Sequence, residues 1–180
     1  MGIPREPRPA KYFVALLSSD SEHLTAVEKD LSTILGAVET RSDVWLWTVS
    51  DFYQKEMGTC LRRRFLSFEP LASPGELARI KILTQQIEDK YRRKVADFTG
   101  RRVNIDPGYI DAFKLALAST KNARQRIYLH SGIYAEATLL YFNGAFHGLA
   151  YTYPDYLWPA TLEFFTSLRA VYVDQLRRPG

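Results

Sequence analysis

The sequence predicts an α/β or α+β fold: a single domain with one mixed sheet of about six or seven strands, helices packed mostly on one face, and a C-terminal antiparallel meander. Three observations predict it. Apolar runs typical of strands alternate with amphipathic helical patterns. Turn signals join the last strands into hairpins. No repeat or linker divides residues 1–180, and residues 1–10 form a proline-rich N-terminal tail.

Strands and helices are expected to alternate along the first two thirds of the chain. Apolar runs rich in β-forming residues predict strands over residues 12–17, 44–49, 62–68 and 103–105. Capping patterns predict helices that start at Ser19, at Ser73-Pro74 and at Asp106-Pro107. Helical spacing of apolar residues predicts a last helix from Pro159 to about Leu176.

Two hairpins are expected between residues 125 and 151. Strands over 125–129 and 133–142 flank His130-Ser131-Gly132. A three-residue loop with Gly132 in the left-handed conformation keeps polar residues on one face and places Arg126 opposite Glu136.

Asn143-Gly144 then predicts a tight two-residue turn. Its register pairs Leu140 with His147, Thr138 with Leu149 and Glu136 with Tyr151.

One face of this meander is the main candidate site, because it is both polar and aromatic. It carries Arg126, Tyr128, Tyr134, Glu136, Thr138, His147 and Tyr151. Glu136 is a candidate general base, and the tyrosines could stack on a flat ligand. The competing interpretation is an exposed sheet face with one ordinary ion pair, which stabilises by less than ~1 kcal/mol. Both interpretations stay open.

Further candidates lie outside the meander. Asp106 is a second candidate acid–base group, and Lys121 would supply a further positive charge. Residues 51–58 are polar yet aromatic, which is typical of a binding loop. Four more residues complete the predicted ligand-binding set: Asp51, Glu56, Arg62 and Arg64.

No metal site is expected, because Cys60 is the only cysteine and the three histidines are scattered. A weaker alternative is a divalent cation shared by Asp20, Asp51 and Asp106, which requires parallel strands that end at one edge. Asp20 and Asp106 are equally suited to capping helices. The sequence leaves the cofactor, the reaction and the oligomeric state undefined.

Composition points to a cytoplasmic protein without a membrane partner. Apolar runs stay well below the roughly 18 residues that a membrane helix needs. Lys and Arg outnumber Asp and Glu by 24 to 20, which gives a sequence pI near 9.2. Basic blocks at residues 62–64 and 90–102 suit phosphate groups, although a solvated helix face would also explain the second block.

Several motifs together resemble a family of short bacterial and archaeal proteins that is catalogued only as a domain of unknown function. They are Glu56-Met57-Gly58, Phe65-Leu66-Ser67-Phe68, Asn104-x-Asp106-Pro107-Gly108-Tyr109, Ser119-Thr120-Lys121, Gly132-Ile133-Tyr134-Ala135-Glu136 and Thr152-Tyr153-Pro154-Asp155-Tyr156. The resemblance covers nearly the whole chain in order. It implies no activity, but it draws attention to the same positions as the residue patterns do.

The first functional hypothesis is an enzyme or a ligand-binding protein for a small anionic molecule, phosphorylated or nucleotide-like. The alternative is an RNA-binding module that uses tyrosine stacking and the basic blocks. A plain protein-interaction domain is a third possibility. A closed pocket around Glu136 would favour the first hypothesis, and an open basic and aromatic face the second.

Overall fold

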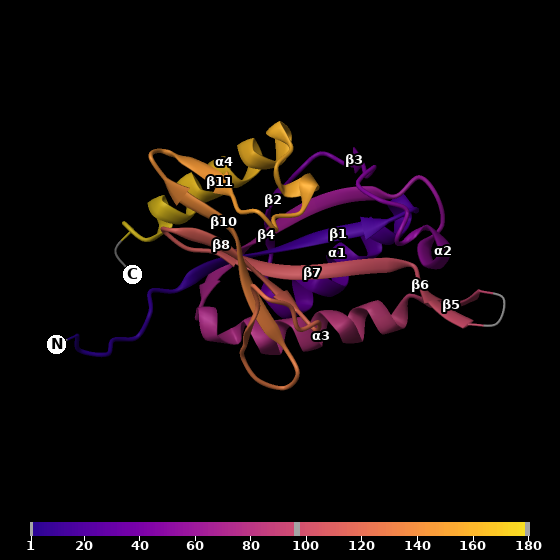
Figure 1. Cartoon of the computed structure of the whole chain (residues 1–180), viewed down its shortest axis with the longest axis horizontal. Helices are drawn as coiled ribbons and strands as arrows, with labels where there is room; N and C mark the ends of the chain where they lie inside the picture. Colours follow the sequence, from indigo (N-terminus) through magenta and orange to yellow (C-terminus); the bar gives the residue numbers. More distant parts are fainter. Residues whose placement is uncertain (1, 96–97, 179–180) are drawn as a thin grey trace.

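The computed structural model of the chain describes residues 2–95 and 98–178 and shows a single α+β domain (Figure 1). Its main sheet has nine strands in this part of the chain. They are β1 (Ala10–Ser18), β2 (Val38–Arg41), β3 (Trp45–Leu46), β4 (Arg62–Ala72), β7 (Val103–Ile110), β8 (Lys114–Ser119), β9 (Ile127–Tyr128), β10 (Tyr134–Phe142) and β11 (Ala145–Gly148). A separate hairpin consists of β5 (Arg92–Val95) and β6 (Phe98–Arg101).

The main sheet is antiparallel in every described pairing, so the prediction of a mixed sheet was wrong in this detail. Its order is β11-β10-β8-β7-β1-β4-β2, with β3 on β4 and β9 on β10. The reason lies at Asp106-Pro107, where a helix was expected. The chain instead continues as strand β7 to Ile110 and turns directly into β8. A short hairpin connection makes neighbouring strands antiparallel.

Helices cover both faces of the sheet. The central strand β1 is buried along its whole length, and its residues alternate between two cores. Val14 and Leu16 pack in a cluster with α1 (Ser21–Leu35) and α3 (Leu77–Lys90). Phe13 and Ala15 pack in a cluster with α4 (Pro159–Gln175). A strand covered on both sides has no polar face, which explains the continuous apolar sequence of β1.

The helix starts follow the sequence closely, with one correction. Ser73 caps a short 3-10 turn at Pro74–Glu76 that leads into α3. At α1 the expected capping box of Ser19 does not form. The carboxylate of Asp20 instead accepts a hydrogen bond of 2.8 Å from the backbone N–H of Glu22.

The loop between β9 and β10 has the predicted three residues. Tyr134 pairs with Tyr128, the N–H of Leu129 donates to the carbonyl of Ile133, and Gly132 has a φ of 76°. The second turn is also as predicted: Asn143 and Gly144 have φ values of 49° and 80°. Both turn predictions are therefore confirmed.

The predicted meander differs in its second half. Leu140 pairs with His147 as expected, but the β10–β11 ladder ends at the pair Leu139–Gly148. Beyond it the chain turns, with the N–H of Thr152 bonded to the carbonyl of Leu149. Thr138 and Glu136 therefore have no ladder partners in residues 149–151. The predicted pairing of Glu136 with Tyr151 was wrong, whereas its pairing with Arg126 follows from the observed register.

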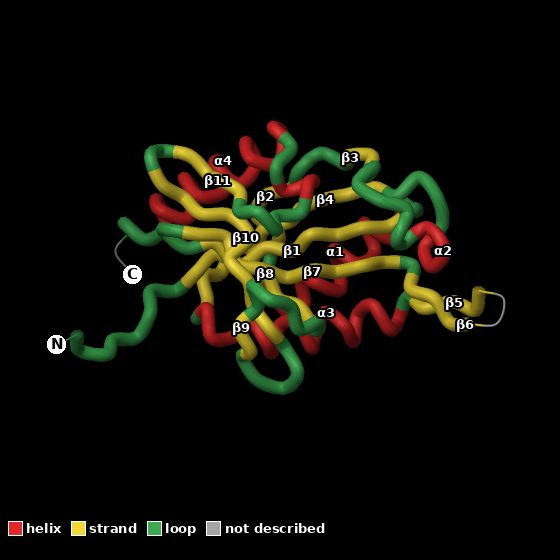
Figure 2. The backbone as a smooth tube through the Cα atoms, viewed as in Figure 1, coloured by secondary structure: helices red, strands yellow, loops and turns green. Residues whose placement is uncertain are grey.

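The sheet opens into a fork between β7 and β8 (Figure 2). These strands pair only through Gly108–Ile110 and Leu115–Leu117, and towards Val103 and Ser119 they diverge. Ile105 directs its N–H and C=O away from β1, towards α3. Pro107 lies two residues further on, so it has the same orientation but no N–H to donate. Pro107 thus marks the point where the β7–β8 ladder stops.

Candidate functional site

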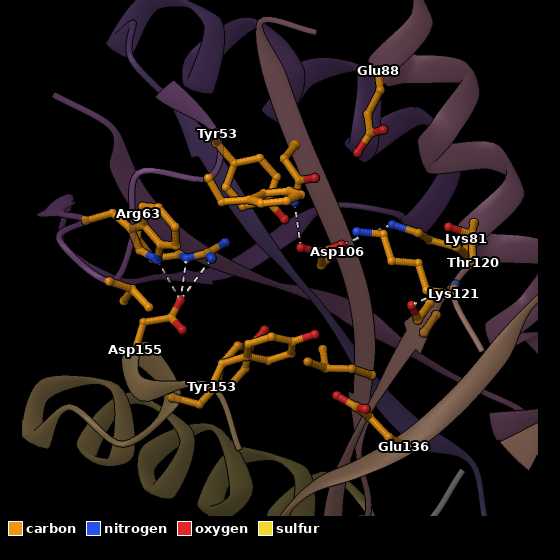
Figure 3. A pocket seen from close by; sticks show the side chains of 18 of the residues that line it. Tyr53, Arg63, Lys81, Glu88, Asp106, Thr120, Lys121, Glu136, Tyr153 and Asp155 are labelled. Atoms are coloured by element: carbon orange, nitrogen blue, oxygen red, sulfur yellow. Dashed lines mark hydrogen bonds and ion pairs between the residues drawn. The ribbon is translucent and has the colours of Figure 1, made fainter. Parts of the chain in front are cut away.

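A pocket of about 370 Å³ occupies the fork, and we call it the fork pocket (Figure 3). Its walls come from β4, β7, β8, β10, α3, the segment after β3 and the turn before α4. In the view of Figure 3, Arg63 with Asp155 lies on one side, Lys81 and Lys121 lie on the other, and Asp106 lies between them. The volume is within the usual range of small-molecule sites.

Strand alternation selects one arginine of the block at residues 62–64. Arg63 shares the face of Phe65 and lines the fork pocket with only 5% of its surface exposed. Arg62 and Arg64 point to the opposite face, where they contact the carbonyl of Ser19 and the carboxylate of Glu28. The predicted ligand-binding residues Arg62 and Arg64 therefore lie outside the lining of the fork pocket, because successive strand residues face opposite ways.

Arg63 forms a buried pair with Asp155, a residue of the short 3-10 turn Pro154–Tyr156. The Nε and Nη2 atoms of Arg63 lie 2.9 and 2.8 Å from Oδ2 of Asp155, which also accepts a hydrogen bond from the indole of Trp47. Within the described residues, the buried Nη1 of Arg63 and the buried hydroxyl of Tyr156 have no hydrogen-bond partner. Buried polar atoms are normally satisfied, so these donors are available to an occupant.

Arg126 is also buried beside the pocket, but its donors are directed at the protein. Nε donates to Glu136 at 2.9 Å, Nη1 to the carbonyl of Lys121 at 2.9 Å, and Nη2 to the hydroxyl of Tyr153 at 2.8 Å. The cross-strand pair with Glu136 confirms the register predicted from the loop length. Arg126 joins three segments of the pocket wall, so it acts as a clamp.

The floor of the pocket is built from β7 and α3. Lys81 donates to the carbonyl of Ile105 at 2.8 Å and to Asp106 at 3.1 Å. Asn104 donates to the other oxygen of Asp106 at 2.5 Å. Glu88 accepts a hydrogen bond of 2.6 Å from the N–H of Ile105.

The pKa values of the two carboxyl groups of the floor shift in opposite directions. Burial raises the pKa of Glu88, and this effect outweighs attraction to Lys81 and the hydrogen bond from Ile105. Burial also acts to raise the pKa of Asp106, but attraction to Lys81 and Arg63 and two hydrogen bonds together lower it. Carboxyl groups whose pKa values move apart are suited to acid and base roles. The floor thus holds two carboxyl groups, of which Glu88 keeps its proton to higher pH than Asp106 does.

Aromatic rings line the pocket, and the exposed Lys121 lies at its mouth. Trp47 and Tyr53 have ring centroids 5.6 Å apart, and Phe52 lies edge-on to Tyr53 at 5.0 Å. The ammonium of Lys121 lies 5.1 Å from the centroid of Phe52. Burial raises the pKa of Tyr53 to about 12, so its hydroxyl stays protonated at neutral pH.

The structure brings together four of the predicted site residues: Glu136, Asp106, Lys121 and Arg126 all line the fork pocket. Glu56 lies behind it, where its carboxylate holds Arg101 at 2.9 Å. That pairing lowers the pKa of Glu56. Asp51 is exposed and bonded to Gln54 of the short helix α2 (Gln54–Met57).

The other predicted residues of the meander face lie outside the pocket lining: Tyr128, Tyr134, Thr138, His147 and Tyr151. The rings of Tyr128 and Tyr134 contact each other, and His147 stacks on Phe142 at 3.9 Å. The hydroxyl of Tyr151 donates to the carbonyl of Ala137. Thr138 is buried at a bulge of β10. Of the predicted face, Arg126 and Glu136 line the fork pocket and the other residues do not.

Sequence reasoning missed several residues of the pocket. Lys81 and Glu88 were not singled out at all. Tyr53 and Arg63 lie within the segments 51–58 and 62–64, and the family motifs include Asn104, Tyr153 and Asp155, but none of these was named individually. One signal was present: Lys81, Gln85 and Glu88 are spaced i, i+4 and i+7, which places three polar residues on one helix face beside the apolar stripe. All three line the pocket.

The weaker metal alternative is not supported by the geometry. In residues 2–95 and 98–178, no group of three or more His, Cys, Asp or Glu side chains is placed to hold a metal ion. β1 and β7 are antiparallel, with Ser18 opposite Val103, so Asp20 and Asp106 do not lie at a common carboxyl edge. Asp20 is a helix cap, as the competing interpretation predicted.

Every helix in the described part of the chain is too short or too polar to cross a membrane.

Comparison with known proteins identifies the family. A search of curated proteins finds no match. The family model described as a domain of unknown function (DUF4416) matches residues 8–172, which include every residue of the fork pocket. The chain therefore belongs to the DUF4416 family, as its motifs predicted.

Proposed function

We propose that the protein binds a small, anionic, phosphorylated or nucleotide-like molecule in the fork pocket. The observation that carries the proposal is Arg63: a buried guanidinium that lines the pocket and whose Nη1 has no partner among the described residues. A buried donor left unsatisfied costs about 1–3 kcal/mol. An occupant that accepts this hydrogen bond would recover that free energy.

The composition of the lining supports the same proposal. Small-molecule sites combine apolar and aromatic walls with a few convergent polar groups. Here Trp47, Tyr53 and Tyr153 supply aromatic surface, while Arg63 and Lys121 supply donors. Glu88 and Asp106 give the pocket the means to move a proton on a bound molecule. Catalysis is thus compatible with the proposed binding.

The test is a thermal-shift screen with nucleoside monophosphates and sugar phosphates. A ligand present at one hundred times its Kd stabilises a protein by about 2.7 kcal/mol, which raises the Tm measurably. We expect at least one compound to stabilise the wild type and Arg62→Lys, and to lose this effect in Arg63→Lys. Arg62 is the matched control because it neighbours Arg63 but faces away. A screen without any shift, or equal shifts in both variants, contradicts the proposal.

A nucleic acid is the second candidate partner, favoured by a different feature. The β5–β6 hairpin projects at the end of α3 (Figure 1), and Arg92, Arg93 and Lys94 on it are exposed. Binding through phosphates weakens steeply with salt. We expect RNA affinity to fall by orders of magnitude from low to moderate salt and in the double variant Arg93→Ala/Lys94→Ala. Salt-independent binding, or none at low salt, removes this candidate.

A further inference from the structure

The charges of the fork pocket are almost fully compensated. Arg63 pairs with Asp155, Lys81 with Asp106, Arg126 with Glu136, and Arg101 with Glu56. Lys121 is different: among the described residues its ammonium forms no salt bridge, and it lies 5.1 Å from the centroid of the Phe52 ring. The uncompensated positive charge of the pocket therefore lies at the exposed mouth. A full negative charge on a ligand would be most favourable there.

The inner end of the pocket has a different chemical character. Asp155 already neutralises Arg63, so a second anion at this end would lie beside an existing carboxylate. Nη1 of Arg63 and the hydroxyl of Tyr156 still offer hydrogen-bond donors. Burial raises the pKa of Tyr156, so its hydroxyl remains a donor. Donors without net charge suit a neutral acceptor such as a ring carbonyl.

The two ends are separated by aromatic surface. Trp47, Tyr53 and Tyr153 line the pocket. In the view of Figure 3, Tyr53 and Tyr153 lie between Arg63 on one side and Lys121 on the other. Aromatic rings favour stacked or edge contacts with flat groups. Beside Lys121, Ser119 and Thr120 also line the pocket and add hydroxyl groups at the mouth.

We propose that the occupant is a nucleoside monophosphate whose base carries a ring carbonyl. The carbonyl accepts hydrogen bonds from Arg63 and Tyr156 at the inner end, and the phosphate lies against Lys121 at the mouth. This inference rests on the proposed function and adds to it the ligand class and the direction in which the ligand lies.

Inosine and adenosine 5′-monophosphate provide a matched pair of probes. They differ at one edge of the base, where inosine has a carbonyl acceptor beside an N–H donor and adenosine has an amino donor beside a ring nitrogen acceptor. We expect inosine 5′-monophosphate to bind the wild type at least about tenfold more tightly by calorimetry, because a site built for an acceptor rejects a donor. Tyr156→Phe should reduce that preference without changing the shape of the pocket.

A charge variant tests the direction of binding. Lys121→Gln should weaken the monophosphate by about tenfold or more and leave the unphosphorylated nucleoside inosine unchanged, whereas Arg124→Gln, an exposed neighbour, should change neither. Equal losses for both ligands in Lys121→Gln, or a preference for the adenosine compound, overturn the inference. Binding of a sugar phosphate alone overturns the inference but leaves the proposed function intact. Absence of binding by every compound overturns both.

Discussion

Two buried arginine–carboxylate pairs lie beside the same pocket, and they differ in how their donors are used. Arg126 holds Glu136 and directs its remaining nitrogens at the carbonyl of Lys121 and the hydroxyl of Tyr153. Arg63 holds Asp155 but leaves Nη1 without a partner among the described residues. Burial and pairing alone do not distinguish a structural arginine from a binding one. The unused donor does, and under the proposed function it makes Arg126 the clamp and Arg63 the contact for the ligand.

The largest expected effect is on the clamp. Arg126→Met removes three hydrogen bonds and leaves Glu136 buried with Gln125 as its remaining hydrogen-bond partner among the described residues. Removing one partner of a buried pair typically costs about 3–5 kcal/mol. Urea unfolding should show a loss of this size, while Arg124→Met, two residues away and exposed, should stay within about 0.5 kcal/mol. A small loss for Arg126→Met would mean that the clamp does not hold the segments together.

The carboxylates of the two pairs give a smaller effect and a sharper contrast. Asp155→Asn and Glu136→Gln each replace charge-assisted hydrogen bonds, which contribute about 1.5–3 kcal/mol. In Asp155→Asn the charge of Arg63 faces the pocket uncompensated, so inorganic phosphate should raise the Tm of this variant more than that of the wild type. In Glu136→Gln it should not, because Arg126 remains engaged with Lys121 and Tyr153. Equal responses would remove the distinction between the arginines.

Glu88 extends the comparison to a carboxyl group with a weaker arginine contact, since Arg101 lies 3.6 Å away. Because burial raises its pKa, the folded protein binds more protons than the unfolded chain above about pH 4.3. The contribution of Glu88 to stability is therefore complete at low pH and is lost as the pH rises through the folded-state pKa.

Glu88→Gln should remove this loss. The difference in unfolding free energy between wild type and variant should fall from acid to neutral pH, by about 1.4 kcal/mol for each unit by which the two pKa values differ. Urea unfolding at several pH values measures it, with the exposed Glu163→Gln as control. A difference that is constant with pH, or that rises, contradicts a raised pKa.

The smallest effect is expected next to Arg63. Arg62→Gln loses one hydrogen bond to the carbonyl of Ser19 on the opposite face. It should cost less than ~1 kcal/mol and leave ligand affinity unchanged. A loss of affinity comparable to that of Arg63→Lys would show that strand alternation does not decide which arginine serves the pocket.

Local signals predicted the parts of the site that depend on neighbouring residues. Loop length determined the Arg126–Glu136 register, and a buried pair indeed forms there. The choice of Arg63 over its neighbours was beyond such signals. The strand β4 is covered on both faces, because four successive residues are buried: Phe65, Leu66, Ser67 and Phe68. Its sequence therefore does not alternate between polar and apolar residues, and it does not indicate which arginine faces the pocket.

The pocket itself depends on contacts between distant segments. It exists because β7 and β8 are unpaired between Val103 and Pro107, and because α3 lies next to this open side of β7. Asp106-Pro107 was interpreted as a helix start, since an Asp-Pro pair is a good cap. In the structure both residues belong to a strand. A local preference was overridden by pairing with β1.

The fork also has a consequence for how the protein avoids association with other chains. Between Val103 and Pro107, the edge of β7 that faces α3 is not paired with another strand. Such edges readily accept a strand from another molecule. Lys81 and Glu88 bond the carbonyl and the N–H of Ile105, so they occupy the positions that a foreign strand would use. The same two side chains thus serve the chemistry of the pocket and the protection of the edge, and replacing both would favour strand exchange and aggregation.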